Sequence, residues 1–142
     1  MADGHQVALH GFRHRAQVRL TAAQLTDDLD RGLAAIEDAT GISPSLHRPP
    51  YGVYSAVGLR LVRQRGLQPL LWSRWGKDWR RFTTPERIAR RAAAGARRGD
   101  VLLLHDADFY SASGSHRRTV EALPQILATL GSAGLASVVL AK

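Results

Sequence analysis

The hydrophobic residues of this chain alternate between helical spacing and short unbroken runs. Apolar residues repeat at intervals of three and four, as on one face of a helix, over four segments: about 21–41, 55–65, 84–98 and 120–130. Runs of strand length lie between or beside them: the segment leading to His10, and residues 70–72, 101–104 and 138–140. Helices alternating with strands are typical of a parallel α/β fold.

Local signals mark several of the expected helix ends. Thr21 and Gln24 have capping-box spacing, and Gly41 offers a C-terminal stop for the first helix. The acidic pair at 27–28 falls within this helix and is expected on its surface. Pro124 is expected to limit or kink the first turns of the last helix, which Val120, Leu123, Leu127 and Leu130 mark.

Length and composition favour one soluble domain over residues 1–142. The chain is 44% hydrophobic, and it contains no run near the roughly 20 apolar residues that cross a membrane. It has no cysteine, which excludes disulfides, thiolate catalysis and Cys-ligated zinc. No secretory signal is visible in the chain as given, so a cytoplasmic location is the default expectation.

The net charge of +8 raises nucleic acid as a partner, because clustered basic side chains bind phosphates. Only Lys77 and Lys142 of the 20 basic residues are lysine, and a bias toward Arg, Ala, Leu and Gly is also a mark of coding composition. The arginines of segment 84–98 are expected to form a solvated helix face. We therefore expect no nucleic-acid partner, and an Arg-rich nucleic-acid binder is the least favoured alternative.

Unusual polar residues follow the expected strands, where ligands gather in parallel α/β proteins. His10 and His14 follow the first strand, the segment 48–52 follows a short extended stretch, and His105 follows the run 101–104. Two imidazoles four residues apart are a metal-ligand signal, although zinc in a hydrolytic site usually takes a third protein ligand. Each motif alone also has a structural explanation as a turn or a satisfied strand-end histidine.

Four ordered segments together resemble the motifs of the polysaccharide deacetylase family, also described as the NodB-homology or carbohydrate esterase family 4 domain. The segment His10–His14 is similar to the second motif, with Gly11 in place of a hydroxyl residue, and Arg48-Pro49-Pro50-Tyr51-Gly52 is a close match to the third. Asp78-Trp79 is similar to the end of the fourth motif, and Leu103-Leu104-His105-Asp106 to the fifth. The resemblance implies a distorted (β/α) barrel that removes acetyl groups from sugars with a divalent metal, most often zinc.

The resemblance also implies roles for single residues. His10 and His14 would bind the metal, which acidifies its water and polarises the acetyl carbonyl. His105 would be the general acid, and the backbone N–H of Tyr51 would help to stabilise the oxyanion.

Supporting roles follow from the same resemblance. Arg48 would orient the base carboxylate, with a surface ion pair as its alternative. Pro49 and Pro50 would stiffen the substrate-binding loop, and Asp78 would tune His105, because Trp75 stands where the family often has an acid. Trp79 would contact the sugar, although Trp72, Trp75 and Trp79 are also explained as core and rim aromatics.

The chain has no counterpart of the family's first motif, Thr-Phe-Asp-Asp-Gly, which the resemblance makes the source of the catalytic base and the third metal ligand. We therefore expect a barrel that is incomplete at its N-terminus, through truncation or a misassigned start. Such a barrel would expose an edge through which copies could pair. The main alternative to an enzyme is an inactive barrel remnant that binds a glycan or a protein partner.

Overall fold

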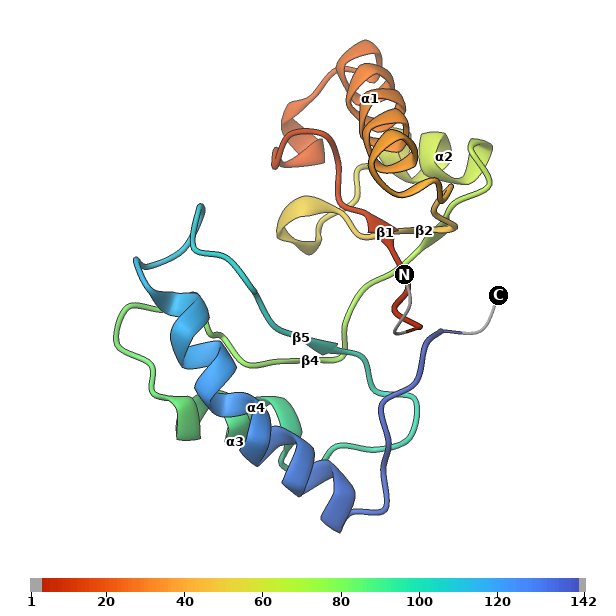
Figure 1. Ribbon diagram of the computed structural model, residues 1–142. Helices are drawn as coiled ribbons and strands as arrows, with labels where there is room; N and C mark the ends of the chain where they lie inside the picture. The colour runs from red at the N-terminus through yellow and green to blue at the C-terminus, as the bar shows by residue number, and fades with distance from the viewer. Residues whose placement is uncertain (1–3, 141–142) are drawn as a thin grey trace. The chain divides into compact units, whose positions relative to one another are not determined.

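The chain folds into two compact units, each with parallel strands and two main helices (Figure 1). The structure is a computed structural model and describes residues 4–140. Among them, the first unit holds residues 4–71 and 139–140, and the second holds residues 72–138. The expectation of a single domain over the whole chain stays a prediction.

The first unit is built on three parallel strands in the order β1-β2-β3. These strands are β1 (Ala8–Leu9), β2 (Leu46–His47) and β3 (Gln68–Pro69), and Leu9 pairs with His47, which pairs with Pro69. Helix α1 (Ala22–Thr40) connects β1 to β2, and α2 (Ala56–Gln64) connects β2 to β3. The succession of strand, helix and parallel strand confirms the predicted α/β class.

The core of the first unit joins its strands to its helices. Leu9 of β1, Leu29 of α1, Val62 of α2 and Leu67 form one buried cluster. Two single-turn 3₁₀ helices, η1 (Gln17–Arg19) and η2 (Pro50–Gly52), lie in the segments after β1 and β2. Because Leu9 is buried at the end of β1, the residues that follow it are placed directly beside the helices.

The predicted limits of α1 are confirmed. Thr21 accepts a hydrogen bond from the backbone N–H of Gln24, and the Gln24 side chain accepts one from Thr21 N–H, which completes the capping box. Gly41 ends the helix in the left-handed conformation, with φ of 68°. The side chain of Ser55 caps α2 in the same way by accepting from Gly58 N–H.

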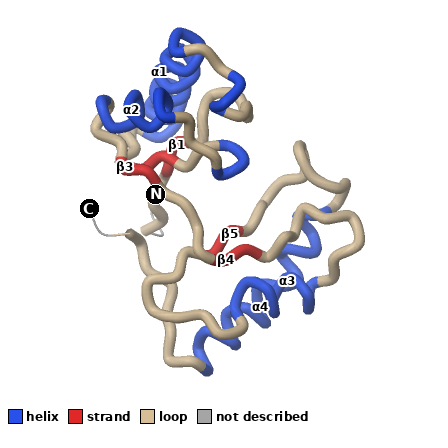
Figure 2. Tube along the Cα trace, turned by 180° about the vertical axis from the view of Figure 1, so that it is seen from behind, coloured by secondary structure: helices blue, strands red, loops and turns tan. Residues whose placement is uncertain are grey.

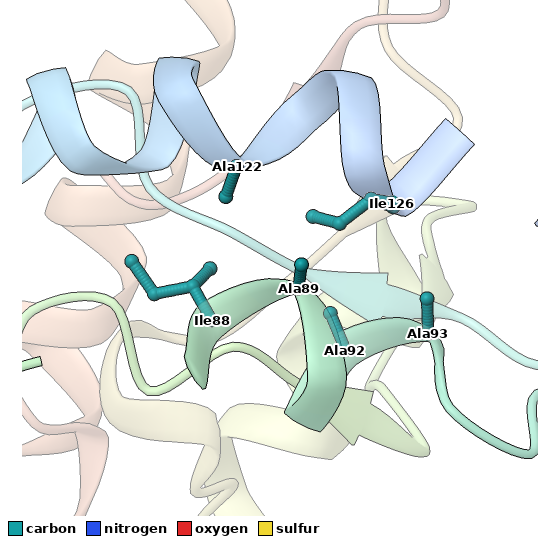
Figure 3. Packing of buried hydrophobic residues seen from close by; sticks show 6 residues of the cluster. All are labelled: Ile88, Ala89, Ala92, Ala93, Ala122 and Ile126. Atoms are coloured by element: carbon teal, nitrogen blue, oxygen red, sulfur yellow. The ribbon is translucent and has the colours of Figure 1, made fainter. Parts of the chain in front are cut away.

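The second unit pairs β4 (Arg74–Trp75) with β5 (Leu102–Leu103) in parallel. Helix α3 (Pro85–Ala93) connects the two strands, and α4 (Ser115–Ser132) follows β5 (Figure 2). Small residues let α3 and α4 pack closely, because Ala89, Ala92 and Ala93 of α3 face Ala122 and Ile126 of α4 (Figure 3). The arginines of α3, Arg87, Arg90 and Arg91, are exposed as expected.

Two of the predicted strands are wrong. The apolar run 70–72 is not a strand, because β2 pairs with residues 68–69 before it, and Leu71 is 46% exposed. Residues 138–140 form no strand either, and Val138 is 83% exposed. An apolar run becomes a strand only where a neighbouring strand pairs with it. Leu70 N–H still donates to the carbonyl oxygen of His47 at 2.8 Å, but the register of β2 with β3 ends at Pro69.

Helix α4 differs from the expectation in two ways. The helix begins at Ser115 and contains Pro124 in its interior, so the proline does not limit the first turns, and the buried face of the helix carries Ala122 and Ile126. Val120 and Leu127, which mark the helix in the sequence, are 62% and 58% exposed.

The predicted pairing of copies through an exposed barrel edge stays a prediction. Within residues 4–140, no helix combines the length and the apolar character that crossing a membrane requires.

Candidate active site

The two histidines of the second motif lie beside each other after β1. The ring centroids of His10 and His14 are 5.1 Å apart, and the rings meet edge to face. The His10 Nδ1 atom lies 2.7 Å from the carbonyl oxygen of Arg48, which can only accept a hydrogen bond. His10 is therefore protonated on Nδ1 when neutral and carries its lone pair on Nε2, which is a tautomer in which an imidazole can bind a metal.

The third motif lies against the same histidines. Arg48 N–H donates to the carbonyl oxygen of Leu9 at 2.9 Å, which continues the pairing of β1 with β2. The ring of Tyr51 packs edge to face on His14 with centroids 4.7 Å apart. The sequence thus brings the predicted residues His10, His14, Arg48 and Tyr51 together within the first unit.

The turn after β2 has an unusual backbone. Tyr51 adopts φ of 60°, a left-handed conformation that is rare for a bulky side chain. Gly52 follows with φ of 72° and donates its N–H to the carbonyl oxygen of Pro49 at 3.0 Å. Pro49 and Pro50 are both buried. Their rings fix the backbone φ angle at both positions, which stiffens the turn. Strained backbone of this kind is common at functional sites.

A buried aspartate that sequence reasoning placed on the surface supports the two-histidine loop. Asp28 of α1 is 7% exposed, and its carboxylate accepts hydrogen bonds from the backbone N–H groups of Phe12 and Arg13. Its neighbour Asp27 is exposed, as expected. The sequence did contain a signal, since position 28 lies three residues after Leu25 and four before Gly32, on the buried face of α1.

A buried carboxylate anchors the histidine of the fifth motif in the second unit. Asp78 is fully buried, and His105 donates to it twice, from its backbone N–H at 2.6 Å and from its ring Nδ1 at 2.9 Å. Thr119 of α4 adds a third hydrogen bond to the same carboxylate, at 2.9 Å. Sequence reasoning named Asp78 and His105 but missed Thr119, because nothing in the sequence links α4 to this pair.

These hydrogen bonds keep Asp78 ionised. Burial by itself raises the pKa of Asp78, but the hydrogen bonds from His105 and Thr119 outweigh burial and hold the pKa below its ordinary value. An ionised carboxylate at Nδ1 fixes the ring orientation and the tautomer, in which the proton is on Nδ1 and the lone pair is on Nε2. The His105 side chain is 34% exposed, so part of the residue is open to solvent.

Three tryptophans form a row that ends at His105. Trp72, Trp75 and Trp79 follow one another with ring centroids 5.7 and 5.5 Å apart, and Trp79 lies 5.6 Å from His105. Trp75 is 38% exposed, and the Nζ atom of Lys77 lies 5.2 Å from the centroid of its ring. Trp79 is therefore beside the histidine that was predicted to meet the leaving group.

The donor set fits part of a metal site. Zinc accepts neutral imidazole nitrogens, and the His10 tautomer suits this role. Among residues 4–140, no group of three or more His, Cys, Asp or Glu side chains is arranged to hold a metal ion. The described residues thus bring two imidazoles together, one fewer than the three protein ligands that a hydrolytic zinc site usually takes.

Comparisons with known proteins identify relatives of the chain. The sequence profile of the family described as polysaccharide deacetylase matches residues 1–70. The peptidoglycan-N-acetylglucosamine deacetylase PgdA of Listeria monocytogenes is 28% identical over 134 residues, which make up 94% of this chain and 26% of that protein. The chain therefore spans about a quarter of the length of this curated relative.

Solved structures show the same fold. The family 4 carbohydrate esterase of Streptomyces lividans, in complex with acetate, matches 96% of this chain and 66% of its own chain, with a TM-score of 0.83 and 29% identity. A family 4 acetyl xylan esterase of Clostridium thermocellum, in complex with a cobalt ion, matches 96% of this chain and 62% of its own, with a TM-score of 0.85 and 28% identity. The α/β fold is that of the NodB-type barrel domains, and residues 1–70 of the chain match the polysaccharide deacetylase family.

Proposed function

We propose that this chain contains catalytic and metal-binding residues of a metal-dependent deacetylase that removes acetyl groups from the amino groups of sugars. The observation that carries the proposal is the Asp78–His105 pair, in which a buried carboxylate fixes Nδ1 and leaves Nε2 for proton transfer. Amide hydrolysis needs such an acid, because an amine is a poor leaving group until it carries a proton. The family and the carbohydrate-directed activities of its named members support the choice of substrate class.

The residues of the first unit would hold the metal and the acetyl group. His10 and His14 would be two of the ligands of a divalent ion, which we assign as zinc by ligand type. When bound, such an ion supplies an acidified water and polarises the carbonyl. The Tyr51 N–H, held in a stiff and strained turn, would donate to the oxyanion.

The residues of the second unit would handle the leaving group. His105 would pass a proton from Nε2 to the departing nitrogen while Asp78 balances the positive charge of the protonated ring. Trp79 would offer an apolar face to the sugar, since it packs against His105. The guanidinium of Arg48 would orient the carboxylate that acts as base.

The test is the formation of free amine from N-acetylglucosamine oligomers by the chain loaded with zinc, cobalt or no metal. Because the chain has no Thr-Phe-Asp-Asp-Gly sequence, the assay is run with and without formate, whose carboxylate can act as an external base. We expect amine formation that depends on metal and is abolished in the His105→Ala variant.

The outcome that contradicts the proposal is the absence of amine under both conditions while metal is bound by the histidine pair. Glycan binding in that case would favour the inactive barrel remnant. Amine formation that survives the loss of His105 would contradict the assigned role of this residue.

A further inference from the structure

One carboxylate ties the two-histidine loop to helix α1. The Oδ2 atom of Asp28 accepts from Phe12 N–H, and its Oδ1 atom accepts from Arg13 N–H, both at 3.1 Å. The guanidinium of Arg15 adds a contact of 3.3 Å to Oδ1. All three donors belong to the segment that contains His14 or borders it, so Asp28 holds the loop from the helix side.

Two glycines allow this contact. Gly11 has φ of +82°, and a Cβ atom at this position would lie 2.7 Å from Asp28 Oδ2. Gly32 lies one turn after Asp28 on α1, and a Cβ atom there would lie 3.1 Å from Phe12 N and 3.2 Å from Gly11 C. The loop backbone is therefore in direct contact with α1, and Gly11, which stands where the family has a hydroxyl residue, leaves room for the carboxylate.

The opposite side of the loop is fixed by the strand layer. His10 contacts the Arg48 carbonyl oxygen, and the ring of Pro50 lies next to Gly11, with its Cγ atom 3.8 Å from the Cβ position there. The backbone between the two histidines thus has β2 and its turn on one side and Asp28 on the other. Removing Asp28 would leave the N–H donors of Phe12 and Arg13 without this acceptor and free the loop to move.

We propose that Asp28 is a positioning residue that holds His10 and His14 as a pre-formed chelating pair. The inference rests on the metal-binding role proposed for these histidines. Residues that hydrogen-bond behind metal ligands typically contribute 10- to 100-fold to metal affinity, because they fix the orientation of the ligands. Asp28 would act in this way through the loop backbone rather than through an imidazole ring.

The first test measures chelation by the histidine pair without hydrolysis. The probe is Cu(II) iminodiacetate, which brings its own carboxylate and amine donors and needs only two imidazoles, so it does not depend on a third protein ligand. We expect the full chain to bind this probe through His10 and His14, and Asp28→Asn to weaken binding by at least about tenfold. The nitrogen couplings in the electron paramagnetic resonance spectrum report whether both rings are bound.

Asp30→Asn is the matched control. Asp30 also lies on α1 and forms an ion pair with Arg65 at 2.6 Å, but it makes none of the contacts to the loop. A general loss of an α1 carboxylate would affect both variants, whereas the proposal predicts wild-type affinity in Asp30→Asn. Equal affinity in Asp28→Asn and the wild type, or a wild type that does not chelate the probe, overturns the proposal.

Amide hydrogen exchange gives a second test that requires no variant. We expect the N–H groups of Phe12 and Arg13 to be protected in the wild type, because both donate to a buried carboxylate. Exchange at the rate of an unstructured loop overturns the proposal even if Asp28→Asn does not fold. Chelation without amine formation from sugars would instead contradict the proposed function and leave the role of Asp28 standing.

Discussion

Single buried polar residues organise both parts of the candidate site. Asp28 and Asp78 are almost completely removed from solvent, and each accepts three hydrogen bonds, among them backbone N–H groups of a predicted site segment. A buried carboxylate is tolerated only when it is satisfied in this way. The backbone that presents a histidine therefore depends on an acid from a distant element.

His47 of β2 is a fully buried histidine with a structural role. Its backbone carbonyl accepts from the Tyr54 hydroxyl at 2.7 Å, which uses the only proton of that hydroxyl. The ring Nδ1, 2.9 Å from the same oxygen, must then donate, and Nε2 keeps its lone pair. Within the described residues, Nε2 has no hydrogen-bond partner, so a second proton there would be buried and unsatisfied.

This arrangement predicts acid sensitivity. Burial first, and then the charge of His10, lower the pKa of His47 to about 4, against about 6.5 in an unfolded chain. The stabilisation is complete above pH 6.5 and decreases as the pH falls to 4, because the unfolded chain binds a proton that the folded chain rejects. The loss in free energy of unfolding approaches about 3 kcal/mol at pH 4.

Urea denaturation between pH 7 and pH 4 measures this loss, with His47→Phe as the comparison. The variant keeps an aromatic ring but cannot titrate, so its free energy of unfolding should depend less steeply on pH. Identical pH dependence in the two proteins would contradict the account of His47.

At the scale of elements, the two faces of α4 have different roles. Ile126 is 3% exposed in the cluster with α3, whereas the next residue, Leu127, is 58% exposed. We expect Ile126→Ala to lower the free energy of unfolding by about 2–5 kcal/mol, because it leaves a cavity. Leu127→Ala should change it by no more than about 0.5 kcal/mol. Chemical denaturation of the two variants checks this, and equal losses would show that the buried face is assigned wrongly.

Elements could be predicted from sequence where their signals are local. The capping box at Thr21 and the stop at Gly41 fixed the limits of α1, since both depend on residues within one turn. The strand predicted at 70–72 was wrong because strand formation depends on a partner strand, and β2 pairs with Gln68 and Pro69 instead. Similarly, Val120 and Leu127 have helical spacing, but the packing of α3 selects Ala122 and Ile126 for the buried face.

The candidate site shows the same division. Motif resemblance found His10, His14, Arg48 and Tyr51, which share one unit, and also the pair of Asp78 with His105. It missed Thr119 and misplaced Asp28, because both contribute through contacts between elements far apart in the sequence. Their functional roles stay predictions.

For the whole molecule, the resemblance of the motif set predicts that the histidine pair of the first unit and His105 of the second serve one reaction. Residues 1–70 match the polysaccharide deacetylase family, relatives such as PgdA are named as deacetylases, and each unit holds part of the motif set. Residues that act as a unit in catalysis show strongly non-additive losses, because removing any one already disables the shared step.

The most direct test is a double-mutant cycle on the rate of amine formation, with His10→Ala, His105→Ala and the double variant. Each single replacement should lower the rate by about 100-fold or more, and the double variant should be no more than a few-fold slower than the slower single variant. Losses that multiply, or a single variant that retains the wild-type rate, would contradict the claim.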